Sequence, residues 1–206
     1  MRFRGVGLGL LLALVLSAAL SGFGVGSRLL GRPSAATVPT PDARASLRAQ
    51  HRLAELLMRA GGLSHRADPV ELSSAELNAF LARHVESRRL PLRPLLVRAE
   101  EGRLEVAGGA SVRQIGPEWL RALLPDVLLD LDLWLAVQGH LEVRPGEGEF
   151  VVERAAVGRQ PVPPGWLWRL LDLDPREHLT WRMPRIVDRI EVKRDRLVIY
   201  TRHRGG

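Results

Sequence analysis

The chain has 206 residues, a formal net charge of +7 and no cysteine. Without cysteine, neither a disulfide framework nor a lipoprotein acylation site is possible. About 160 residues follow the N-terminal apolar segment and linker described below, which is enough for one domain with a substantial core.

The basic residues are arginines with one exception, Lys193. A GC-rich genome explains this composition without any function. The alternative is attraction to an anionic membrane surface or to acidic envelope polymers. Nucleic acid is not an expected partner, because the chain has the features of an exported protein and has no basic helix or strand of a recognised nucleic-acid-binding kind.

The N-terminal residues 1–27 contain an uncharged, leucine-rich run from 5 to 27. This run exceeds the roughly 20 residues that a helix needs to span a bilayer, which predicts a transmembrane anchor. A cleaved signal peptide is the alternative, because small residues at 17–21 would suit cleavage after a short apolar core. Either reading implies export. We expect a single-pass protein of the inner (cytoplasmic) membrane, with its C-terminal domain outside the cytoplasm, in the periplasm or the extracellular space.

Residues 28–44 form the predicted linker between this segment and the domain. They are rich in proline and small residues and have no apolar periodicity, which favours an extended spacer. Residues 45–206 then form one predicted extracytoplasmic domain.

The first predicted helix covers residues 42–60. Its apolar stripe consists of Leu53, Leu56, Leu57 and Ala60, and a Gly-Gly pair follows it.

A second helix begins near Ser73. Ser73 and Glu76 form a capping box, in which each side chain satisfies the exposed backbone amide of the other residue. Leu77, Phe80 and Leu81 make the apolar face of this helix.

Strands in an antiparallel series follow. A hairpin is predicted from residues 95–99 and 103–113, with Leu104, Val106 and Val112 in one phase of the second strand.

The longest predicted strand runs from residue 127 to 143, after a short helix at 117–124. Its apolar and polar residues alternate, which is typical of a strand with one apolar face. The same residues also fit a helical spacing, but a helix across Pro125 would cost about 3 kcal/mol, so we favour the strand. Its apolar phase begins with Val127, Leu129, Leu131, Leu133, Leu135 and Val137.

The remaining elements are a strand at 149–158, a helix at 165–173 and a closing hairpin at 190–199. The apolar face of the strand cannot be assigned, because each register places a charge near its middle, Glu153 or Arg154. The predicted fold is therefore α+β, a long curved antiparallel sheet packed against a few helices.

Helices that are too few to cover the sheet would leave a groove for an apolar ligand. The predicted lining comes from the second helix and from the two apolar strand phases. It consists of Leu77, Phe80, Leu81, Leu104, Val106, Val112, Leu129, Leu131, Leu133, Leu135 and Val137.

No residue pattern predicts catalysis, a metal site or a cofactor. The six histidines are scattered without the spacing of metal ligands. Asp130 and Asp132 resemble a catalytic carboxylate pair, but the solvated face of an amphipathic strand explains them better. Tryptophans such as Trp134 and Trp181 suit either core packing or a position at a groove mouth near lipid headgroups.

The chain resembles small membrane-anchored bacterial envelope proteins of the YpmS type and, more distantly, LmeA-like and TULIP-type lipid-binding domains. The matching features are the N-terminal span, the helix opener at 72–81, the long amphipathic strands and the Val-Gly-Arg-Gln-Pro-Val-Pro segment at 157–163. The resemblance implies a half-barrel sheet wrapped around a helix, with a groove for acyl chains and no catalytic residue. The segment at 181–184 departs from the pattern.

We therefore expect a membrane-anchored, non-catalytic domain that binds lipid or another apolar ligand. The alternative is a structural or scaffolding subunit of a cell-envelope complex, with envelope proteins as partners and no groove. An enzyme is a more distant alternative. The C-terminal segment is also expected to contact anionic membrane lipid through Arg194, Arg196, Arg202 and Arg204.

Overall fold

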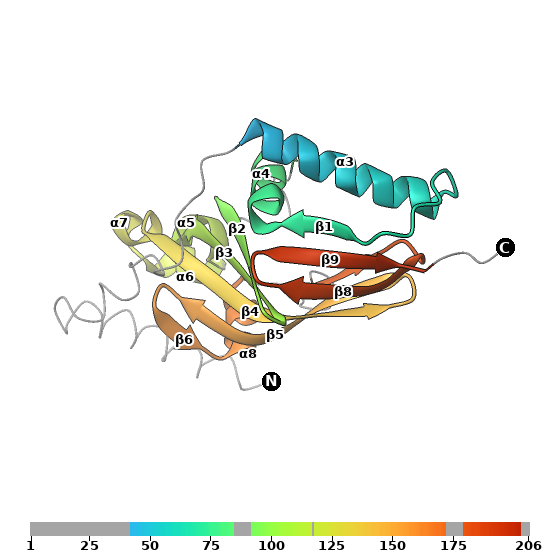
Figure 1. The fold of residues 1–206 in the computed structure, drawn as a ribbon. Coiled ribbons are helices and arrows are strands. Elements are labelled where there is room, and N and C mark those ends of the chain that lie inside the picture. Colours follow the sequence, from blue (N-terminus) through green and yellow to red (C-terminus); the bar gives the residue numbers. More distant parts are fainter. Residues whose placement is uncertain (1–41, 85–91, 117, 172–178, 203–206) are drawn as a thin grey trace.

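The computed structural model describes residues 42–84, 92–116, 118–171 and 179–202. They form an α+β fold with a large antiparallel sheet, a small antiparallel sheet and several helices (Figure 1). The helices are α3 (Ala43–Ala60), α4 (Ser74–His84), α5 (Val112–Ile115), α6 (Glu118–Leu123), α7 (Asp126–Leu129) and α8 (Pro164–Leu171). The strands are β1 (Val70–Ser73), β2 (Leu95–Glu100), β3 (Arg103–Ser111), β4 (Asp132–Arg144), β5 (Glu147–Val157), β6 (Gln160–Val162), β7 (Thr180–Arg182), β8 (Val187–Lys193) and β9 (Arg196–Thr201).

The large sheet has six strands in the described parts of the chain. Its order is β2–β3–β4–β5–β6, and β7 pairs with the opposite end of β5. The 13 residues of β4 give it a length of about 43 Å. The sheet is open, since β2 and β6 lie at its two edges and are not paired with each other.

The small sheet has the order β1–β9–β8. Its strand β8 packs against β2, β3 and β4 of the large sheet, while β1 packs against α3 and α4. The small sheet therefore lies between α3 and the large sheet, as Figure 1 shows, whereas α4 also packs directly against β2.

The four predicted helices are confirmed as α3, α4, α6 and α8. The capping box of α4 is formed, because the Ser73 amide donates to Glu76 Oε2 at 3.0 Å and the Glu76 amide donates to Ser73 Oγ at 3.2 Å. Helix α3 begins after Asp42, whose side chain accepts a hydrogen bond from the Arg44 amide. The prediction that Leu57 faces the core is wrong, because this side chain is exposed.

The prediction of a strand from residue 127 is also wrong. Pro125 is the N-cap of the one-turn helix α7, and its carbonyl accepts hydrogen bonds from the amides of Leu128 and Leu129. A proline at a helix start loses no intrahelical bond, so it does not oppose this helix as it would oppose a continuous one. The strand begins only at Asp132.

The strand β5 contains a β-bulge that explains why its apolar face could not be assigned from sequence. Gln138 is paired with Arg154, whereas the next residue of β4, Gly139, is paired with Val152. Glu153 is therefore an extra residue, and it shifts the phase of the strand by one position. Both Glu153 and Arg154 are exposed.

The hairpin of β8 and β9 is confirmed, with its turn at Arg194 and Asp195. No helix within the described parts of the chain is both long enough and apolar enough to cross a bilayer. The predicted anchor at 1–27 lies outside those parts.

Candidate functional site

The candidate site is the apolar face of the large sheet. Leu133, Leu135 and Val137 of β4 lie on this face, opposite Ala110, Gly108 and Val106 of β3 in the strand register. Elements of the same chain cover the two ends of the face differently.

One end of the face is filled by the small sheet. Leu104 of β3 and Phe150 of β5 are buried there against Val192 of β8 and Leu197 of β9. Leu77 of α4 packs against the same cluster.

The other end of the face is covered by short helices. Leu135 and Val157 are buried in a cluster with Ile115 of α5 and Leu167 of α8. Leu133 packs against this cluster and is half-buried.

Val106 and Val137 lie between these two covered ends. They are directly opposite each other on β3 and β4, and both are half-buried. Val137 packs against both clusters, whereas Val106 packs only against the one beneath the small sheet. The two valines therefore mark the strip of the apolar face at which the two covers meet, and we call it the central strip.

The structure brings only part of the predicted lining together. Leu77, Leu81, Leu104, Val106 and Val137 belong to the cluster beneath the small sheet.

Phe80 is not part of that cluster. It packs in the core beneath α3, and its ring stacks on His84 at 4.8 Å between ring centroids. Val112, Leu129 and Leu131 do not lie on the sheet, because the chain is helical at Val112 and Leu129 and β4 begins after Leu131.

The predicted membrane-contacting arginines are partly neutralised. Arg196 is 3.1 Å from a Glu71 carboxylate oxygen, and Arg202 is 2.7 Å from one of Asp188. Arg194 is exposed on the β8–β9 turn. Arg204 lies outside the described residues.

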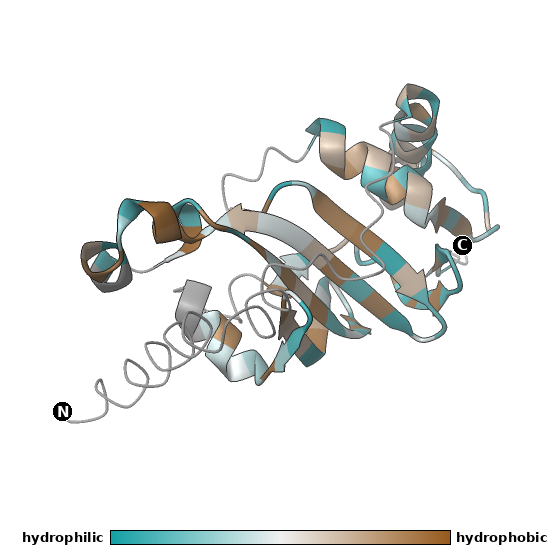
Figure 2. Cartoon of the chain, turned by 90° about the vertical axis from the view of Figure 1, so that its left-hand side faces the viewer, coloured by the Kyte–Doolittle hydropathy of each residue, from teal (hydrophilic) through white to brown (hydrophobic). Residues whose placement is uncertain are grey.

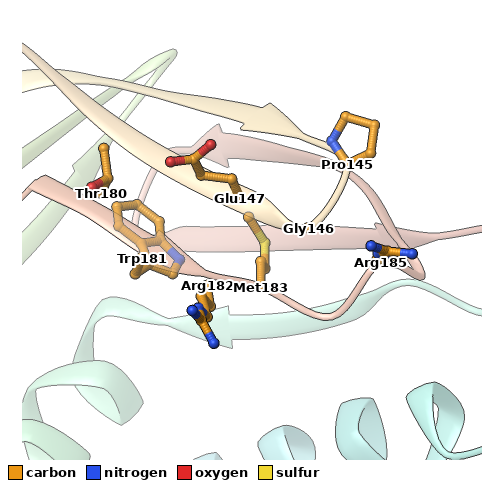
Figure 3. A pocket seen from close by; sticks show the side chains of 8 residues that line it. All are labelled: Pro145, Gly146, Glu147, Thr180, Trp181, Arg182, Met183 and Arg185. Carbon is orange, nitrogen blue, oxygen red and sulfur yellow. The ribbon is translucent and has the colours of Figure 1, made fainter.

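Sequence reasoning missed a hollow of about 640 Å³ at the far end of the large sheet (Figure 3). Its lining comes from the β4–β5 turn, from β7 and from the segment after β7. Trp181 packs directly over Gly148, its partner in the strand register, where a Cβ would approach the indole to 2.6 Å. The sequence signal for this hollow is weak, since it consists of one glycine opposite one tryptophan of a three-residue strand.

The opposite face of the large sheet carries an exposed polar group. His140 Nδ1 is 2.9 Å from a Glu153 carboxylate oxygen, and Arg103 Nε is 3.2 Å from the other. The hydrogen bond with His140 and the charge of Arg103 together lower the pKa of Glu153. Trp134 also lies on this face, where it is buried next to Gly109.

The carboxylates Asp130 and Asp132 do not share a strand face, because Asp130 is the C-cap of α7 and β4 begins at Asp132. Asp130 is bonded to Arg113 at 2.8 Å, and this hydrogen bond lowers its pKa. Within the described ranges, no group of three or more side chains is placed to hold a metal ion.

Comparison of the chain with protein-family models, with curated proteins and with solved structures found no match.

Proposed function

We propose that this chain is a membrane-anchored, extracytoplasmic domain that binds lipid or another apolar ligand and has no catalytic activity. The anchor is the uncharged run at 5–27, and the domain lies outside the cytoplasm. The sheet would act as a TULIP-like half-barrel, in keeping with the resemblance of the sequence to that class.

The observation that supports this function is the central strip. Val106 and Val137 are only half-buried although the same face is filled on both sides of them. An acyl chain lying there would gain about 0.8 kcal/mol for each methylene removed from water. The groove in this proposal is shorter than the lining predicted from sequence, because the small sheet already covers Leu104.

A test compares two tryptophan variants of adjacent residues on β4. Val137→Trp would fill the central strip, whereas Gln138→Trp places the same bulk on the opposite face of the sheet. The full chain is purified in detergent, and bound lipid is measured by native mass spectrometry. We expect lipid on the wild type and on Gln138→Trp and much less lipid on Val137→Trp.

A second candidate is a structural subunit of a cell-envelope complex. The three clusters of buried side chains that fill much of the interior favour it. In that case Val137→Trp would overpack a closed core and lower stability by about 1–3 kcal/mol. The wild type would then carry no lipid, and this result would contradict the first proposal.

A further inference from the structure

The outward face of α3 carries an apolar stripe. Leu47 is 49% exposed, Leu57 64% and Met58 41%. Leu63, which lies three residues after the end of the helix, is 81% exposed. Exposed apolar residues that gather on one element mark an interaction surface more often than scattered ones do.

The stripe lies opposite the buried face of the helix. With 3.6 residues per turn, Leu47, Ala54 and Met58 lie within about 40° of one another around the axis, and Leu57 lies at the edge of the stripe, about 80° from Leu47. Ala49 and Leu56 project from the other side, where they pack against β1 and β9. Helix α3 therefore has two apolar faces, of which the domain uses one.

Ion pairs hold α3 in this rotation. The Glu76 side chain on α4 is only 5% exposed and pairs with Arg48 at 3.1 Å and Arg52 at 3.3 Å. Arg59 is 2% exposed and pairs with Asp68, outside the helix, at 3.5 Å. Turning the stripe inward would leave buried charges without partners, which is strongly unfavourable. The stripe is therefore a fixed outer surface.

The position of α3 in the chain indicates what covers this surface. The linker residues 28–41 lead directly into its N-cap, Asp42, and these 14 residues can span at most about 50 Å. Figures 1 and 2 show α3 at the periphery of the molecule, on the outer side of the small sheet. A bilayer that holds residues 5–27 is thus always within reach of this helix.

We propose that α3 lies with its stripe in the interfacial region of the membrane that anchors the chain. This inference rests on the anchorage in the proposed function. An amphipathic helix that buries its apolar stripe at the boundary between lipid headgroups and acyl chains lies in the plane of the membrane surface. In this orientation the membrane would cover the stripe of α3. Because the linker keeps α3 close to the bilayer, the effective concentration of the helix at the membrane surface is high. Few apolar side chains therefore suffice for docking.

Polar side chains beside the stripe suit a lipid headgroup surface, and Arg44 among them is cationic. Arg44 and His51 lie on its flank and are exposed. Neither side chain forms an ion pair with any residue that the structure describes. Glu55 lies on the same flank, but its charge is offset by Arg59.

The test uses spin labels, because a chain without cysteine accepts a single label at a chosen position. The full chain carrying Met58→Cys is reconstituted into vesicles of equal parts phosphatidylcholine and phosphatidylglycerol. Arg154→Cys, on the far face of the large sheet, is the control position. Accessibility of each label to oxygen and to a water-soluble nickel complex reports its depth.

We expect the label at position 58 to be accessible to oxygen and protected from nickel, and the label at 154 to be accessible to nickel. Adding Leu47→Glu and Leu57→Glu should weaken docking about a hundredfold and return the label at 58 to water. A single leucine-to-glutamate substitution in α6, Leu123→Glu, should leave the label at position 58 in the membrane.

Two results would overturn the inference. Nickel access at position 58 in a chain that floats with the vesicles would refute docking and leave the anchor intact. Dipolar broadening of the spectrum would show that labels at position 58 of two chains lie close together. If mixing in unlabelled chain removes this broadening, a second copy covers the stripe. A chain that fails to float with the vesicles would refute the anchor as well.

Discussion

Asn78 on α4 and Val97 on β2 are joined by two hydrogen bonds. The Asn78 side-chain amide donates to the Val97 carbonyl at 2.8 Å, and its oxygen accepts from the Val97 amide at 2.6 Å. Ser74 Oγ accepts from the Ala99 amide at 3.1 Å, and the Asp195 amide donates to the Ala99 carbonyl at 3.0 Å. Side chains and a turn thus take the place of a further strand at the edge of the large sheet, and they position α4 beside its apolar face.

Replacing this asparagine should therefore cost more than a surface substitution. Asn78→Ala leaves a backbone donor and an acceptor of Val97 without partners, and we expect a loss of about 2–3 kcal/mol in the free energy of unfolding. Asn78→Asp retains the acceptor, so its free energy of unfolding should lie between those of the wild type and Asn78→Ala. Urea denaturation followed by circular dichroism measures both. A loss for Asn78→Ala below about 0.5 kcal/mol would show that water replaces the side chain.

Local signals in the sequence were sufficient for α3, α4, α6, α8 and the closing hairpin, but not for the one-turn helices α5 and α7. The capping box of Ser73 and Glu76 involves residues three apart, so its chemistry is readable without the fold. The alternation from Leu133 onward likewise identified β4. It failed at Val127, because over one turn a helix and a strand can share the same apolar pattern.

The covering of the candidate site could not be predicted. The small sheet joins β1 to strands more than 110 residues later in the chain, and no local pattern shows that Val192 and Leu197 lie over Leu104. The bulge at Glu153 also depends on pairing with β4. The outer stripe of α3 was missed because Leu57 fits the inward stripe by spacing alone, whereas the ion pairs of Arg48 and Arg52 set the actual rotation.

The ion pairs of Glu76 should make stability depend on pH. Burial raises the pKa of Glu76, but hydrogen bonds from the Ser73 amide and from Arg48 outweigh it, so the pKa lies below its usual value. The stabilisation is therefore complete above about pH 4.3 and is lost as the pH falls through the lowered pKa. Glu76→Gln should be less stable than the wild type by about 1–2 kcal/mol at neutral pH, and the difference should shrink in acid.

Glu71→Gln serves as the control for this pH dependence. Glu71 forms an exposed pair with Arg196, and such pairs contribute little. Urea denaturation at neutral and acidic pH measures both variants. A difference for Glu76→Gln that stays constant with pH would contradict this role of the carboxylate.

Replacing either of two glycines with alanine should change the stability of the fold, in opposite directions for the two positions. A Cβ at Gly139, beside the bulge, would lie 1.9 Å from the Val151 carbonyl oxygen, so the backbone must move. Gly165 in α8 has open space around this position. We expect Gly139→Ala to destabilise the fold by more than about 3 kcal/mol and Gly165→Ala to stabilise it by up to about 1 kcal/mol, measured by urea denaturation. Equal effects would contradict the packing at the bulge.

The C-terminal arginines should differ in their effect on binding to anionic membranes. Arg194 is exposed on its turn, whereas the charge of Arg196 is offset by Glu71. In a chain of residues 42–206, Arg194→Gln should weaken binding to phosphatidylglycerol vesicles by up to about fivefold, and Arg196→Gln should weaken it less. Vesicle flotation at low and physiological salt measures this. Equal binding of both variants and the wild type would remove the membrane role from this hairpin.

The location of a bound acyl chain tests the proposed function most directly. A fatty acid with a photoreactive diazirine at its end is incubated with the full chain in detergent, irradiated, and mapped by peptide mass spectrometry. The proposal predicts cross-links in β3 and β4 around Val106 and Val137, which Val137→Trp abolishes and Gln138→Trp retains. Cross-links confined to residues 1–41, or unchanged in Val137→Trp, would contradict it.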